Sequence, residues 1–169
     1  MAAIEELLQL FAQSIFAKAK ALKRLELSPN QRKRLGRSIT DDIRTCGGVI
    51  FPDVIPPAVS KAAHQEAERI GLNICAKAWH DQTAFDKGRK TFHWEHVNPV
   101  SSIQKMCEGA DSEGTILDIL KQRLRIAWIL KREDLELRRL GYRSNRPDPE
   151  GAYRDAKIDF MRFQGDTPR

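Results

Sequence analysis

Apolar residues in the first part of the chain recur with the period of a helix. Between residues 4 and 25 they occupy positions 4, 7, 8, 11, 15, 22 and 25. This spacing predicts an amphipathic helix of about six turns, roughly 33 Å long. Ser28 and Pro29 then provide an N-cap and a first-turn proline. The two glycines after Cys46 predict that this second helix ends near that residue.

The middle of the chain predicts a connector followed by further helices. Residues 49–57 contain three prolines, so this segment cannot be a central strand. A helical pattern runs from Ala58 to about Ile70, and the apolar segment 72–79 predicts another helix. We therefore expect an N-terminal helical region over residues 1–57 and a second region over residues 58–169, which together form one compact unit.

The second half of the chain contains the only strand patterns. Residues 91–97 alternate aromatic or branched residues with polar ones after a turn at 86–90, and residues 124–130 are rich in β-forming residues. A helix capped by Ser112 is expected over 113–123, and another over 134–140. The predicted fold class is therefore α+β, mostly helical with one small hairpin. Trp94 and Trp128 are expected to face each other across that hairpin.

Composition narrows the classes of protein that this chain can be. The 169 residues are 41% apolar and 31% charged, which suits one packed core and excludes a disordered chain. No apolar run reaches the ~18 residues of a membrane span, and Glu5 and Glu6 lie where an export signal carries positive charge. We expect a cytoplasmic protein. The three cysteines form no CxxC pair, which indicates buried reduced thiols.

The net charge of +6 is concentrated in three basic clusters. The first spans residues 18–37, the second contains Lys87, Arg89 and Lys90, and the third runs over 138–146. Such clusters suit a polyanion such as nucleic acid. Arg143 and Arg146 flank a turn and are candidates for gripping phosphates. The alternative for these two arginines is salt bridging to Asp148 or Glu150, and for the clusters it is a solvated surface of balanced charge.

One predicted strand carries the residues suited to catalysis. His93, Glu95 and His96 lie on it, and alternation places His93 and Glu95 on one face, with Trp94 and His96 on the other. A carboxylate beside a histidine at a strand end suits hydrolysis of a phosphodiester. The carboxylate can hold a hard divalent cation, and the imidazole can accept a proton from water near neutral pH. The alternative is an exposed acid beside a histidine at the edge of the core.

The sequence Glu95-His96-Val97-Asn98-Pro99 resembles the opening motif of the HNH, or ββα-metal, nuclease superfamily. This resemblance covers at most residues 85–141. It implies a β-hairpin and a following helix around one divalent cation, Mg²⁺ or Mn²⁺, with DNA as the partner. Glu95 would bind the metal and His96 would be the general base. Restriction-type, phage and mobile-element nucleases of this superfamily often carry helical additions.

The helical ligand of that motif has no direct counterpart here. No histidine follows His96, and the predicted helix has no asparagine, so Glu133 or Asp134 would have to supply the ligand. Both acids also lie where the helix dipole favours negative charge. His93 is a second catalytic candidate that would orient the metal ligand or contact DNA, and the alternative for it is packing beside Phe92.

Two functions remain open from the sequence. The first is a metal-dependent DNA endonuclease. The second is a non-catalytic nucleic-acid-binding or regulatory helical protein, whose helices over 4–25 and 28–46 form the partner surface. The apolar stripe on the first helix is compatible with a homodimer in either case.

Overall fold

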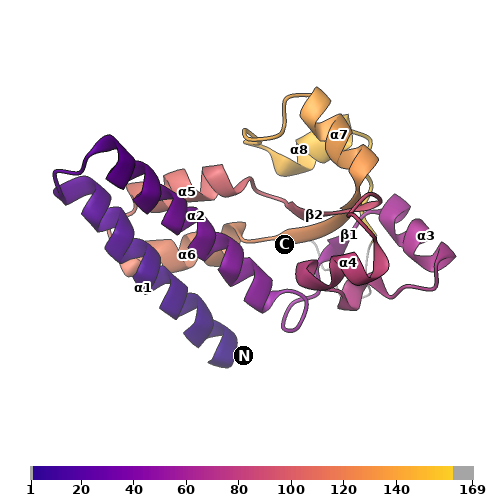
Figure 1. Ribbon diagram of the computed structural model, residues 1–169, viewed down its shortest axis with the longest axis horizontal. Coiled ribbons are helices and arrows are strands. Elements are labelled where there is room, and N and C mark those ends of the chain that lie inside the picture. The colour runs from indigo at the N-terminus through magenta and orange to yellow at the C-terminus, as the bar shows by residue number, and fades with distance from the viewer. Residues whose placement is uncertain (1, 162–169) are drawn as a thin grey trace.

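The computed structural model describes residues 2–161 and has a helical end and a sheet end (Figure 1). The helical end consists of α1 (Ala2–Arg24), α2 (Pro29–Ile50), α5 (Val100–Gly109) and α6 (Glu113–Arg123). The sheet end consists of β1 (Ala58–Val59), α3 (Lys61–Arg69), two 3-10 turns (Ile74–Ala76 and Trp79–Asp81), α4 (Gln82–Phe85), β2 (Phe92–His96), β3 (Ile126–Leu130), α7 (Lys131–Arg139) and α8 (Pro149–Asp155). This composition confirms the mostly helical α+β fold.

The helical end has one apolar core to which both halves of the chain contribute. Leu8, Ala12, Ile15 and Ala19 of α1 are buried against residues of α2, α5 and α6. The apolar stripe that is compatible with a homodimer is thus covered by this chain itself. No helix within residues 2–161 is long and apolar enough to span a membrane.

Helix α2 begins where the sequence predicts and ends later. The Ser28 hydroxyl accepts the backbone N–H of Gln31, which makes Ser28 the N-cap. The predicted end near Cys46 is wrong, because the helix passes through both glycines to Ile50. Ile50 and Phe51 are buried in the core, and their burial favours the additional turn.

The sheet contains the predicted hairpin and one strand more. Strands β2 and β3 are antiparallel, with Trp94 opposite Trp128 and their ring centroids 4.8 Å apart, as predicted. The unpredicted strand β1 pairs in parallel with β3, so the sheet order is β1-β3-β2. The helix expected from Ala58 instead starts at Lys61, because Ser60 caps it by accepting the backbone N–H of Ala63.

The helix predicted over 72–79 is wrong. The chain forms two short 3-10 turns there. The backbone carbonyl of Lys77 accepts the indole N–H of Trp128 across the core, and Ile74 is buried beside the sheet. In a continuous helix, the Lys77 carbonyl and the Ile74 side chain would be placed differently. These tertiary contacts therefore override the local helical pattern.

Helices cover both faces of the central strand β3, whose five residues are all buried. Ala127 and Ile129 contact the core beneath α7 and α8, whereas Trp128 and Leu130 contact the core on the side of α3.

Helix α6 has its predicted bounds and its Ser112 cap, α7 begins earlier than predicted, and α5 and α8 were not predicted. The three cysteines are free thiols, and two of them, Cys46 and Cys107, are buried.

Candidate functional site

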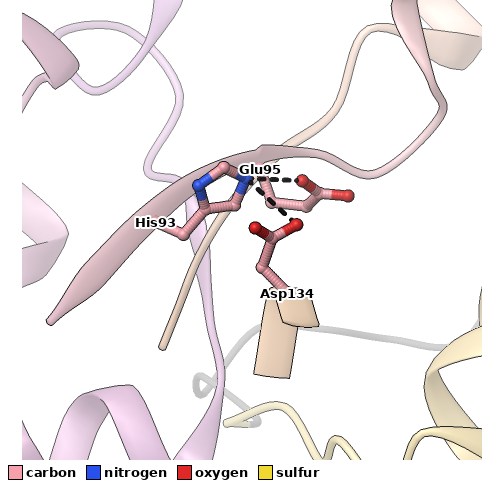
Figure 2. A group of neighbouring side chains, drawn as sticks. All are labelled: His93, Glu95 and Asp134. Carbon is pink, nitrogen blue, oxygen red and sulfur yellow. Dashed lines mark hydrogen bonds and ion pairs between the residues drawn. The ribbon is translucent and has the colours of Figure 1, made fainter. Parts of the chain in front are cut away.

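Two carboxylates and one imidazole, those of Glu95, Asp134 and His93, meet between strand β2 and helix α7 (Figure 2). The His93 Nε2 atom lies 3.0 Å from Glu95 Oε2 and 3.6 Å from Asp134 Oδ1. One possible ligand atom from each residue lies within 4.8 Å of the other two. Glu95 and Asp134 are buried and His93 is partly buried. We call these three residues the acid–imidazole group.

Local structure brings this group together. His93 and Glu95 share a face of β2 because side chains alternate along a strand, and the antiparallel register places Glu95 opposite the small side chain of Ala127. Helix α7 follows β3 with no intervening loop. Its first turns therefore lie beside β2, and Asp134 is buried there together with Leu137.

Each member of the acid–imidazole group also contacts a cation. Arg146 Nη2 lies 2.7 Å from Glu95 Oε1, and Arg138 binds both oxygens of Asp134, at 3.0 Å and 2.8 Å. Lys131 Nζ lies 3.0 Å from the Nδ1 atom of His93. Within residues 2–161, each carboxylate is therefore held by one arginine, and the imidazole is contacted by one lysine.

Arg146 is the most deeply buried of these cations, with 2% of its side chain exposed. Its guanidinium also donates to the carbonyl oxygens of Tyr142 and Val97 and to the Tyr153 hydroxyl. Burial raises the pKa of the Glu95 carboxyl, but the hydrogen bond with His93 and the charge of Arg146 outweigh it, and the pKa is lowered overall. Glu95 is thus ionised at neutral pH.

His96 occupies the opposite face of β2, as strand alternation predicts. Its Nε2 atom is buried and has no hydrogen-bond partner among residues 2–161. Burial lowers the pKa of His96 to about 4, although the Glu95 charge opposes this effect. In the free protein His96 is therefore neutral, and it is a weaker base than an ordinary imidazole.

A cavity of about 780 Å³ joins the two faces at this end of the strand. His93, Glu95 and His96 all line it, although His96 is not part of the acid–imidazole group. Arg44 from α2 and Arg143 from the loop after α7 line the same cavity, and both are exposed. Two exposed cations thus border the cavity that the predicted ligand and the predicted base share.

Of the two acids predicted to complete the ligand set, the structure brings only Asp134 to the group. Glu133 lies one residue away, and its Oε2 atom accepts the backbone N–H of Leu130 and the hydroxyl of Ser60, each at 2.7 Å. Glu133 thus caps α7 and links it to the start of α3.

The predicted nucleic-acid-binding residues fall in three different environments. Arg143 is exposed at the cavity, whereas Arg146 is buried on Glu95 and pairs with neither Asp148 nor Glu150. Lys87 and Lys90 are exposed on the turn before β2, and Arg89 lies 4.0 Å above the ring of Trp79, which lines the cavity.

Sequence reasoning missed four residues of this site: Lys131, Arg138, Arg44 and His80. The spacing of Arg138 four residues after Asp134 on a predicted helix was a usable signal. Arg44 lines the cavity because of the way α2 packs against the rest of the chain. No local sequence pattern indicates such packing between distant segments.

Comparison of the chain with protein-family models, with curated proteins and with solved structures gives no match.

Proposed function

We propose that this chain is a metal-dependent endonuclease that hydrolyses phosphodiester bonds in DNA by ββα-metal chemistry. One observation carries the proposal. Glu95 from the first hairpin strand and Asp134 from the helix after the second strand converge with His93 beside the cavity that His96 lines. The order strand, strand, helix is the one that the HNH resemblance implies, with α5 and α6 inserted between the strands.

The acid–imidazole group has the donors that a divalent cation needs. Carboxylate oxygens suit Mg²⁺ or Mn²⁺, and the three donor atoms lie close enough to share one ion. Arg146 holds one oxygen of Glu95, which leaves Oε2 directed at His93 and Asp134. Arg138 is 41% exposed and can move away from Asp134. When bound, the ion would neutralise charge on the scissile phosphate and on the leaving oxygen.

The other residues of the cavity supply the remaining functions. His96 is neutral and its Nε2 atom has no partner among the described residues, so it can accept a proton from an attacking water. Arg44 and Arg143 carry fixed positive charge at the same cavity and can hold a phosphate through charge-assisted hydrogen bonds.

Cleavage of a supercoiled plasmid tests this proposal. We expect nicking with Mg²⁺ or Mn²⁺, none with EDTA, and strong loss in His96→Ala and Glu95→Gln. Glu136→Gln is the matched control, because within residues 2–161 the ion pair of Glu136 is a surface pair with Arg139, on the same helix as Asp134. Wild-type protein that leaves the plasmid intact with every metal contradicts the proposal.

A second candidate is a non-catalytic nucleic-acid-binding protein. The observation that favours it is the complete pairing of the acid–imidazole group with Lys131, Arg138 and Arg146, which balances the carboxylates without a metal. That protein would bind DNA equally well in EDTA and would never cut it.

A further inference from the structure

One face of helix α2 carries a row of exposed basic side chains that leads toward the cavity. Lys33, Arg37 and Arg44 follow one another at helical spacings, with Thr40 between the last two. They border a surface groove of about 720 Å³ whose other wall is formed by Gln104 and Glu108 of α5. We call this the α2 groove.

The α2 groove and the candidate site meet at Arg44. Arg44 lines both the groove and the cavity that contains Glu95 and His96. A ligand that follows the row of cations from Lys33 therefore arrives at the cavity. Gly36 also lines the groove, and a Cβ atom at this position would lie 3.2 Å from Nε2 of Gln104 on the other wall.

The charges in the groove are available to a ligand. Within residues 2–161, Lys33 and Arg37 form no ion pair with any carboxylate. Arg44 lies 3.5 Å from Asp41, and both of these side chains are more than half exposed, so this pair contributes little. The groove's carboxylate, Glu108, accepts a hydrogen bond from Gln104 at 2.7 Å, and Gln104 in turn accepts one from the Thr40 hydroxyl.

We propose that the α2 groove binds the sugar–phosphate backbone of duplex DNA and directs one strand into the cavity. The cavity end of this inference rests on the proposed nuclease function. At 1.5 Å per residue, Lys33 and Arg44 are ~16 Å apart along the helix axis. This distance corresponds to about five phosphates of one strand at ~3.4 Å along the duplex. A flat lipid surface could contact the row of cations but could not enter the groove or the cavity. A phosphodiester chain can lie along the groove and extend into the cavity.

Binding of a fluorescent 20-base-pair duplex in EDTA tests this inference without cleavage. The groove variant is Lys33→Gln with Arg37→Gln, and neither residue lines the cavity. The control is Arg132→Gln with Lys157→Gln, two exposed cations that line neither the groove nor the cavity. Both double variants lose the same charge, so general electrostatic attraction changes equally.

We expect the groove variant to bind about 100-fold more weakly at 50 mM salt, since each lost phosphate contact costs roughly tenfold there. The slope of log K against log[salt] should become shallower by about 2. The control should lose only the small affinity that the change in net charge causes, far less than the groove variant, and should keep the wild-type slope. Groove and control variants that weaken binding equally, or a groove variant that binds as wild type does, overturn the inference.

Two further results distinguish DNA binding in the α2 groove from the nuclease proposal and from membrane binding. If the groove variant loses affinity but no protein form cuts DNA with metal, the groove stands and the nuclease proposal fails. If wild type binds phosphatidylserine vesicles more tightly than DNA, and the groove variant loses that binding, the partner is a membrane and the inference fails.

Discussion

The two faces of strand β2 are made from alternating residues and differ in charge. One face carries paired charged side chains, and the other carries the neutral imidazole of His96. On the α7 face, His93 and Glu95 are hydrogen-bonded to each other, and Lys131 and Arg146 contact them. On the opposite face, the buried Nε2 atom of His96 has no hydrogen-bond partner in the part of the chain that the structure describes. The alternation of a strand keeps the charged acid–imidazole group apart from the neutral imidazole of His96, which is only one residue away from Glu95. Both still border one cavity at the end of the strand.

Removing the proposed base, His96, should have the largest effect on DNA cleavage. We expect His96→Ala to reduce metal-dependent DNA cleavage by about 10²–10⁴-fold, because a general base contributes that much to rate and little to ground-state affinity. Rates at saturating DNA, together with anisotropy and thermal melting, check this. Cleavage at the wild-type rate would remove His96 from the mechanism, and an unfolded variant would show that its role is in the core.

Breaking the buried ion pair on the α7 face should have the largest effect on stability. Arg146→Ala leaves Glu95 buried without its cation and removes bonds to two carbonyl groups. We expect the free energy of unfolding to fall by about 3–5 kcal/mol. Urea denaturation measures it. Arg154→Ala is the control, because Arg154 forms a loose surface pair with Asp148 at 3.8 Å, and a similar loss there would contradict the account.

The turn before β2 is held by one buried carboxylate, that of Asp86. Asp86 accepts the backbone N–H groups of Lys90, Thr91 and Phe92 and the side-chain amide of Gln82. Burial raises the pKa of Asp86, but these hydrogen bonds lower it by more. We expect Asp86→Asn to cost about 1.5–3 kcal/mol in unfolding free energy at neutral pH.

The pH dependence of that cost follows from the lowered pKa. The unfolded state binds the proton more tightly, so the carboxylate stabilises the fold above the unfolded pKa of about 3.9. This contribution disappears as the pH falls through the folded-state pKa. Urea melts of wild type and Asp86→Asn between pH 7 and pH 3 should therefore converge at low pH. A gap that stays constant, or widens on acidification, contradicts the assignment.

The smallest effect is expected at Glu133, the neighbour of the proposed ligand Asp134. Glu133→Gln weakens the cap on Leu130 and the bond to Ser60, at a cost of about 1 kcal/mol. Metal affinity should not change. A loss of Mn²⁺ affinity equal to that of Asp134→Asn would make Glu133 a ligand and move the site.

Local patterns predicted the hairpin, the helix starts at Ser28 and Ser112, and the separation of Glu95 from His96 across the strand. These features depend on alternation and capping, which act over a few residues. The pairing of Arg146 with Glu95 and the arrival of Arg44 at the cavity depend on packing between distant segments. Strand β1 was missed because two residues give no period, and its pairing is supplied by β3.

Mn²⁺ binding tests most directly whether the α7 face of β2 holds a divalent cation. Titration of the protein followed by electron paramagnetic resonance counts bound ions without requiring cleavage. We expect one bound Mn²⁺ per chain in wild type and in Glu136→Gln, and loss of this ion in Asp134→Asn. Thermal melting curves should show that all three proteins are folded. Absence of a bound ion in wild type, or undiminished binding in Asp134→Asn, would contradict it.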